Sequence, residues 1–205
     1  MYTHVIFDVD GTIMDTSLVC EKALQRLVLS RTGRVLEPHE CSFAFGMTGE
    51  NALPTFGLQN TPDVVAEWDG YFNEMIGEAR VFEGITELLT KLKVRGIKLG
   101  VLTSRAYSEI NIDENFKNIL HYFDNIIAAD DTSEHKPSPA PMYEYLRRTG
   151  ALPNEVLYIG DTIYDYECAK SAGVAFALAT WGAGNTEGIN TRLMPQAPNE
   201  ILKFL

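Results

Sequence analysis

Acidic side chains follow two apolar segments of the sequence. The segment FDVDGT contains Asp8 and Asp10, and the run VLYIG leads into Asp161, with Asp165 one helical turn later. Alternate residues of a strand share a face, so Asp8 and Asp10 are predicted to enter one crevice, where two carboxylates repel each other unless a cation joins them. Carboxylate and carbonyl oxygens suit Mg²⁺, and no His or Cys lies near these motifs in ligand spacing, so zinc is not expected. The pattern predicts a Mg²⁺ site.

A second set of polar residues has the chemistry to hold a phosphoryl group. Thr103 and Ser104 follow the apolar run IKLGVL, and their hydroxyl and backbone N–H groups are donors for phosphoryl oxygens. Lys136 lies in the loop HKPSP, where its ammonium group is a point charge for a phosphate or an aspartyl anion. A nucleophile, a metal, hydroxyl donors and a fixed cation are together the ingredients of phosphoryl transfer.

Strands and helices that alternate along the chain must position these residues. Apolar runs predict strands at residues 2–10, 97–103, 125–129, 155–160 and 174–180. Helical spacing of apolar residues predicts helices at residues 17–31, 61–76, 84–95, 141–149 and 163–172. Residues 12–16 are expected to form a turn. This alternation favours a parallel sheet covered on both faces, in which ligands bind beyond the carboxyl ends of the strands.

The composition of the chain argues against nucleic-acid-binding and membrane proteins. The chain has 28 acidic and 17 basic residues and a formal net charge of −11, so nucleic-acid backbones and anionic membrane surfaces are not expected partners. No apolar run is long enough to span a bilayer, and no basic-then-apolar leader precedes the first strand. Three scattered cysteines without metal-ligand pairing suit a reduced compartment. A cytoplasmic, soluble protein is expected.

The same segments resemble the four motifs of the haloacid dehalogenase superfamily, in its phosphatase branch. FDVDGTIMDT is similar to the first motif, Thr103 matches the second, Lys136 the third, and GDTIYD the fourth, in the same order and spacing. The pattern is similar to that of the phosphoglycolate-phosphatase-like group, and it covers nearly the whole chain outside residues 17–80. The resemblance implies a Rossmann-like α/β core, residues 1–15 and 83–205, with an inserted α-helical cap at residues 16–82.

The resemblance also implies roles for individual residues. Asp8 is expected to be the nucleophile and Asp10 the general acid/base of a phosphatase that forms an aspartyl-phosphate. Mg²⁺ is expected on Asp8, the carbonyl of Asp10 and Asp161, with Asp165 in support. The residues expected to bind phosphate are Thr103, Ser104 and Lys136. The expected partner is a small phosphorylated substrate, and the expected assembly is a monomer or a homodimer.

Two other functions stay open at this point. A mutase of the β-phosphoglucomutase type shares the first motif and the cap, but typically has a Glu-Asp pair in place of Gly160-Asp161 and cationic residues in the cap. A catalytically silent binding or regulatory protein would not need the acidic residues, all of which are present. The substrate is also open, because Ser104-Arg105 stands where phosphoglycolate phosphatases often have Asn-Lys.

The predicted cap has an uneven charge. Between Val35 and Ala79 there is no Lys or Arg, whereas the acidic residues are Glu37, Glu40, Glu50, Asp63, Glu67, Asp69, Glu74 and Glu78. This pattern is typical of a solvated acidic surface. If the segment Gly46–Asn51 faces the core instead, the hypothesis is a monophosphate substrate with a neutral or cationic remainder. The residues that could supply a cation by folding inward are His39, Arg31, Arg34 and Arg80.

Overall fold

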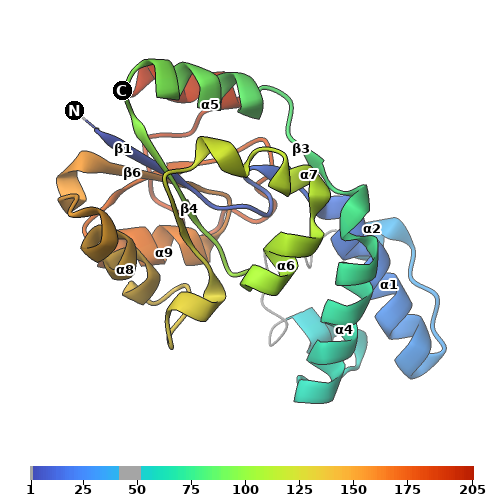
Figure 1. Ribbon diagram of the computed structural model, residues 1–205. Helices are drawn as coiled ribbons and strands as arrows, with labels where there is room; N and C mark the ends of the chain where they lie inside the picture. Colours follow the sequence, from blue (N-terminus) through green and yellow to red (C-terminus); the bar gives the residue numbers. More distant parts are fainter. Residues whose placement is uncertain (1, 42–51) are drawn as a thin grey trace.

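Five parallel strands form the central sheet, in the order β5-β4-β1-β6-β7 (Figure 1). The computed structural model describes residues 2–41 and 52–205. The strands are β1 (His4–Phe7), β4 (Lys98–Leu102), β5 (Asn125–Ile127), β6 (Val156–Gly160) and β7 (Ala175–Leu178). The predicted parallel sheet is confirmed. Each strand is shorter than its predicted range, because the apolar runs continue into loops that leave the hydrogen-bonded ladder.

The central position of β1 determines where the site lies. Phe7 pairs with Val101 of β4 and Ile159 of β6, so Asp8 follows the last paired residue with a strand end on either side. Alternation along β1 also divides the core. Val5 and Phe7 belong to the apolar cluster on one face, and Ile6 belongs to the cluster on the other.

Helices cover both faces of the sheet (Figure 1). α5 (Ile85–Val94) and the 3₁₀ segment η7 (Pro198–Lys203) cover the face of Phe7. α8 (Ala140–Thr149) and α9 (Ile163–Ser171) cover the face of Ile6. Full burial of a side chain such as Phe7 contributes about 1.5–3 kcal/mol, so the two clusters hold the strand ends rigidly.

A helical insertion separates β2 (Met14–Asp15) from β3 (Arg80–Val81). These two strands pair antiparallel, so the prediction of a simple turn at residues 12–16 was wrong in part. A strand of two residues is too short to show the alternation of apolar and polar side chains by which strands are recognised in a sequence. The elements of the insertion are α1 (Ser17–Thr32), α2 (Pro38–Cys41), η2 (Leu53–Phe56), α4 (Pro62–Met75) and η3 (Ile76–Glu78). α1, α2, η2 and α4 share an apolar cluster that includes Leu27, Leu53 and Val64, whereas Ile76 of η3 and Val19 of α1 belong to the cluster of Phe7. Figure 1 shows α1 and α4 extending away from the sheet.

The remaining elements are short and were not predicted. They are α6 (Tyr107–Ile112), α7 (Glu114–Lys117), η4 (Leu120–Tyr122), η5 (Ala129–Asp131) and η6 (Pro153–Glu155). Segments of three to six residues span too few turns for an apolar period to be visible. Within residues 2–41 and 52–205, no helix combines the length and apolarity that crossing a membrane requires.

Candidate active site

Asp8 and Lys136 lie at the centre of the candidate site. The backbone N–H of Asp8 donates to the carbonyl of Ile159 at 2.9 Å, so the side chain is anchored directly beyond β1. Nζ of Lys136 donates to Oδ1 of Asp8 at 2.8 Å and to Oδ1 of Asp165 at 2.7 Å. The Lys136 and Asp8 side chains are only 6% and 8% exposed. Buried charges are tolerated when they are paired and hydrogen-bonded, and this pairing fixes the ammonium between two carboxylates.

Asp165 is held by its own set of donors. Its Oδ1 accepts from the Tyr158 hydroxyl at 2.8 Å, and its Oδ2 accepts from the hydroxyl and backbone N–H of Thr162 at 2.6 and 3.0 Å. Thr162 is the N-cap of α9 and forms a capping box with Asp165. The Thr-x-x-Asp spacing was therefore a usable signal for Thr162. No local pattern marks Tyr158, whose hydroxyl reaches the site from β6.

Asp8, Asp161 and Asp165 form a buried acidic cluster. Each offers one carboxylate oxygen within 4.8 Å of the others. Oδ1 of Asp161 accepts from the Thr12 hydroxyl at 3.1 Å, while Oδ2 of Asp8 and of Asp161 receive no hydrogen bond from the residues that the structure describes. Three carboxylates around one ammonium leave two negative charges to balance. Hard oxygens with this charge fit a divalent ion such as Mg²⁺, which fills its remaining positions with water or substrate.

The acidic cluster perturbs the ionisation of its own members. Burial raises the pKa of Asp8 to about 7 although Lys136 opposes the rise, and burial together with Asp165 and Asp8 raises the pKa of Asp161. Burial is the largest influence on Asp165 too, but attraction to Lys136 and hydrogen bonds from Lys136, Thr162 and Tyr158 together outweigh it and lower the pKa of that carboxyl. The groups around Asp165 therefore stabilise its charge more than the groups around Asp8 stabilise that of Asp8. A divalent cation bound beside Asp8 would favour its ionised form.

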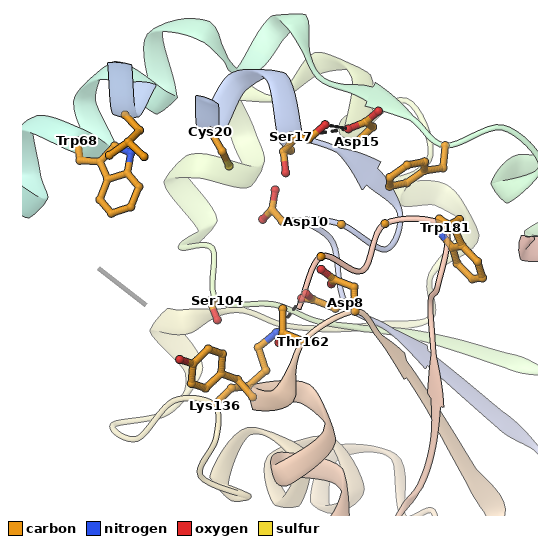
Figure 2. Close-up of a pocket in the computed structure, with 18 residues that line it drawn as sticks. Asp8, Asp10, Asp15, Ser17, Cys20, Trp68, Ser104, Lys136, Thr162 and Trp181 are labelled. Atoms are coloured by element: carbon orange, nitrogen blue, oxygen red, sulfur yellow. Dashed lines mark hydrogen bonds and ion pairs between the residues drawn. The ribbon is translucent and has the colours of Figure 1, made fainter. Parts of the chain in front are cut away.

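The carboxylate of Asp10 is paired with Arg105 and does not belong to the acidic cluster. Nε and Nη2 of Arg105 donate to the two oxygens of Asp10 at 2.9 and 2.6 Å, and Nη1 donates to Asp113 at 2.7 Å. Arg105 is 4% exposed and Asp113 is 0% exposed. Figure 2 shows Asp10 directed toward Ser17 and Cys20, and Asp8 toward Lys136. A buried bidentate guanidinium fixes both the position and the orientation of its carboxylate.

Sequence reasoning did not identify Arg105 or Asp113 as functional residues. Arg105 was noted only as a departure from a common Asn-Lys pair, because a lone arginine after a strand is ordinarily a solvated charge. The partner Asp113 lies beyond the short helix α6, which was itself not predicted. No sequence pattern predicts the ion pair between Arg105 and Asp113, because it forms only when α6 folds back over the end of β4.

Two of the three predicted phosphate-binding residues line a cavity, and the third is buried beneath it. Ser104 and Lys136 line a cavity of about 520 Å³ above the strand ends. Thr103 is buried and is not among the cavity-lining residues, and its Oγ1 accepts from the backbone N–H of Arg105 at 3.1 Å. The structure therefore brings Ser104 and Lys136 together with Asp8 and Asp10, and leaves Thr103 supporting the turn beneath them.

The loop at residues 181–184 closes one side of the cavity. Trp181, Gly182 and Gly184 line it, so this segment lies near the site. Nε1 of Trp181 donates to the carbonyl of Thr12 at 2.9 Å. A Cβ atom at Gly182 would lie 1.8 Å from the carbonyl oxygen of Gly11, so only glycine allows this approach.

The chain is similar to known proteins over most of its length. A family model described as "Haloacid dehalogenase-like hydrolase" matches residues 5–179. Phosphoglycolate phosphatase of Aquifex aeolicus is 31% identical over 208 residues, which cover 98% of this chain and 95% of the relative. Pyrophosphatase PpaX of Bacillus velezensis is 29% identical, with 87% and 83% covered. A Lactobacillus plantarum crystal structure, provisionally named a phosphoglycolate phosphatase, has a TM-score of 0.89 and 26% identity, with 100% of both chains covered.

Proposed function

This chain belongs to the haloacid dehalogenase-like hydrolases and is a phosphatase, and we propose that it hydrolyses small phosphomonoesters with Mg²⁺ through an aspartyl-phosphate on Asp8. One observation carries the proposal. Asp8 stands directly beyond the central strand, 2.8 Å from a buried Lys136 and within metal-ligand reach of Asp161. The names of the relatives make phosphoglycolate and pyrophosphate candidate substrates.

The proposed reaction has two displacements at phosphorus. In the first, a carboxylate oxygen of Asp8 attacks phosphorus and the bond from phosphorus to the leaving alcohol oxygen breaks. That oxygen takes the proton of Asp10 in its protonated form, in which one Asp10 oxygen holds the proton in place of a hydrogen bond from Arg105. In the second, Asp10 accepts a proton from a water molecule, whose oxygen attacks phosphorus and releases Asp8 and inorganic phosphate. When bound, Mg²⁺ neutralises charge on the phosphoryl oxygens and on the acidic cluster. The residues proposed to hold it are Asp8, Asp161 and the carbonyl of Asp10.

The other residues near Asp8 act through charge and position. Lys136 and Ser104 line the cavity and are proposed to hold phosphoryl oxygens, while Thr103 supports the turn that presents Ser104. Oδ1 of Asp165 accepts a hydrogen bond from Lys136. Asp165 is therefore proposed to orient the Lys136 ammonium group and to support the metal site, without binding the metal through both oxygens. Fixed charges of this kind stabilise the transition state without reorganising during the reaction.

The helical insertion is proposed to be a cap, residues 16–82, that closes over the cavity. Its separate apolar cluster supports this division, and its connection through the short β2–β3 pair is a place where a rigid unit can move relative to the core. Closure would exclude bulk water from Asp8. We also propose that the protein acts in the cytoplasm, since Cys20, Cys41 and Cys168 are all free thiols. The proposed assembly is a monomer or homodimer.

Chelation of metal is expected to abolish phosphate release from an aryl monophosphate, and Mg²⁺ is expected to restore it. Ca²⁺ should inhibit, because it prefers more ligands in a looser geometry. Asp161→Ala removes a proposed ligand and should raise the half-saturating Mg²⁺ concentration at least about tenfold, since even the loss of a residue that only orients a ligand commonly costs about 10–100-fold in metal affinity. Colorimetric phosphate release across a Mg²⁺ titration measures both effects.

Two outcomes would contradict this assignment. Full activity in excess chelator would exclude the metal, and an unchanged Mg²⁺ requirement in Asp161→Ala would exclude that ligand. Glu78→Gln is the matched control, because Glu78 pairs with Lys22 on the exposed insertion and lies outside the cavity. A mutase would isomerise a sugar monophosphate without releasing stoichiometric phosphate, and a silent binding protein would release none.

Loss of Arg105 is expected to slow alkyl phosphates much more than aryl phosphates. An alkyl leaving group needs the proton that a correctly held Asp10 supplies, whereas a phenolate leaves with little help. Arg105→Met would also strand the buried Asp113 carboxylate, at a cost of about 3–5 kcal/mol, so the variant to measure is Arg105→Met with Asp113→Asn. We expect kcat to fall about 10–100-fold more for ethyl phosphate than for 4-nitrophenyl phosphate.

A purely structural role for Arg105 predicts a different result. Equal losses on both substrates, together with a lower melting temperature, would mean that Arg105 stabilises the fold without positioning Asp10. Arg105→Lys is the matched control: it keeps the charge but cannot donate to both Asp10 oxygens in the bidentate geometry, so it should recover only part of the alkyl phosphate activity.

A further inference from the structure

The cavity of about 520 Å³ has a charged floor and an apolar roof and wall. Asp8 and Asp161 follow strands β1 and β6, and Lys136 reaches Asp8 from the loop before α8. On the opposite side the insertion contributes Cys20 and Leu24 from α1 and Trp68 from α4, and Figure 2 shows Cys20 and Trp68 there. The polar residues on this side are Asp15, Thr16 and Ser17. The other apolar and aromatic side chains that line it are Phe82, Tyr164 and Trp181. Burial raises the pKa of the Cys20 thiol to about 12, so this group stays uncharged. The part of the cavity beyond the phosphoryl position is therefore mostly apolar.

Positive charge is scarce in this cavity. Among the described residues, Lys136 is the single Lys or Arg that lines it, and Lys136 is already paired with Asp8 and Asp165. Arg105 lies deeper and is committed to Asp10 and Asp113. Within the part of the chain that the structure describes, no Lys or Arg side chain is left over for a second anionic group of a substrate.

The cations of the insertion are engaged elsewhere. Arg31 pairs with Asp63 and Glu67, and Arg34 pairs with Glu40. Arg80 donates to the carbonyls of Gly77 and Ala79 at 2.7 and 2.8 Å. Lys22 and Arg26 pair with Glu78 and Glu74. None of these side chains lines the cavity, and neither does His39.

The segment between α2 and η2 cannot supply the missing cation either. The predicted turn at Gly46–Asn51 lies in residues 42–51, outside the described residues, so the prediction that it faces the core stays untested. Its sequence, SFAFGMTGEN, nevertheless contains no Lys, Arg or His and does contain Glu50. The sequence alone therefore excludes a cationic side chain from residues 42–51.

We propose that the substrate is a phosphomonoester whose remainder is uncharged and largely aliphatic or aromatic, and that substrates with a second anionic group, such as phosphoglycolate and pyrophosphate, are poor. This inference rests on the proposed phosphatase function and goes further by assigning the substrate class. A second anion would lose its hydration without gaining a cation, and that loss is unfavourable. The cavity volume lies in the range of sites for molecules larger than a two-carbon acid, and aromatic walls favour an apolar body.

The test compares two substrates of equal size that differ in one charge, 4-carbamoylphenyl phosphate and 4-carboxyphenyl phosphate. Values of kcat/KM are measured at the same Mg²⁺ concentration and ionic strength. We expect the neutral amide to be favoured at least about tenfold, which corresponds to about 1.4 kcal/mol. Ethyl phosphate should exceed phosphoglycolate, which has the same kind of alkyl leaving group and one more anionic group, by a similar factor. Ratios below tenfold, or a preference for the acidic member of either comparison, would overturn the inference.

A charge added to the roof gives a second readout. Trp68→Lys places an ammonium group on α4 at the cavity, and it should improve the kcat/KM ratio of carboxylate over amide substrate at least about tenfold. Trp68→Leu is the matched control, because it removes the ring without adding charge and should leave the preference for the amide in place. Thermal melting of both variants shows whether they fold. An unchanged ratio in folded Trp68→Lys would contradict the assignment of the roof.

The same assays separate this inference from the proposed function. If Asp8→Asn and chelation abolish turnover but acidic substrates are preferred, the phosphatase function stands and the substrate class is wrong. If turnover survives both treatments, the proposed function itself fails.

Discussion

Asp8→Asn is expected to lower kcat at least about 10³-fold while leaving the fold intact. The amide has nearly the same shape as the carboxylate, and its oxygen can still accept from Nζ of Lys136. It cannot act as the nucleophile, so no covalent phosphoryl intermediate forms. Steady-state phosphate release gives the rate, and mass spectrometry after acid quenching detects the phosphorylated wild-type chain.

The stability of this variant is part of the expected result. Asp8 shares a buried cluster with Asp161 and Asp165, and burial raises its pKa to about 7, so the ionised form is unfavourable without metal. Asp8→Asn should therefore melt at the same temperature as the metal-free wild type or above it at pH 8. Asp63→Asn makes the same chemical change on the exposed surface of α4 and should retain full activity. A folded Asp8→Asn enzyme with a tenth of wild-type activity would remove Asp8 from its role.

Asp10→Asn is expected to lower kcat for alkyl phosphates about 10²–10⁴-fold, the usual range for loss of a general acid or base. The backbone carbonyl proposed to bind Mg²⁺ is retained, and only the proton carrier is removed. With an aryl phosphate, phosphorylation of Asp8 should continue while hydrolysis of the intermediate becomes slow. Rapid-quench kinetics should then show a burst of phenol larger than that of the wild type.

The burst distinguishes Asp10 from Asp8 and from Arg105. Asp8→Asn should show no burst at all, because its intermediate never forms. The Arg105 variant keeps the Asp10 carboxyl and should show a smaller burst than Asp10→Asn. Equal loss of both half-reactions in Asp10→Asn, without a burst, would mean that Asp10 does not carry the proton.

Several features could be predicted because they depend on local pattern. The five strands are visible as apolar runs because both faces of a parallel sheet are buried. The carboxyl ends of such strands meet at one edge, and the family resemblance assigned Asp8 and Asp161 to one metal, so these two residues were expected to lie close together, as they do. The helices α1 and α4 of the insertion could also be predicted, because their apolar residues recur at helical spacing.

Other features arise only when segments distant in the sequence pack together. Arg105 meets Asp10, 95 residues earlier in the chain, and Lys136 meets Asp8 across 128 residues. Asp8 and Asp165 both bind the ammonium group of Lys136, and burial decides how far each carboxylate is ionised. A sequence shows neither that burial nor that shared partner.

The charge of the cap depends partly on the sequence and partly on the tertiary structure. The sequence by itself determined that no Lys or Arg occurs between Val35 and Ala79. Only the tertiary structure decided that Arg31, Arg34 and Arg80 turn toward partners within the insertion, so that its acidic surface and its apolar cavity roof are separate faces. The physical reason is that a side chain's partner is selected by the packing of whole helices, whereas periodicity records only which positions are apolar.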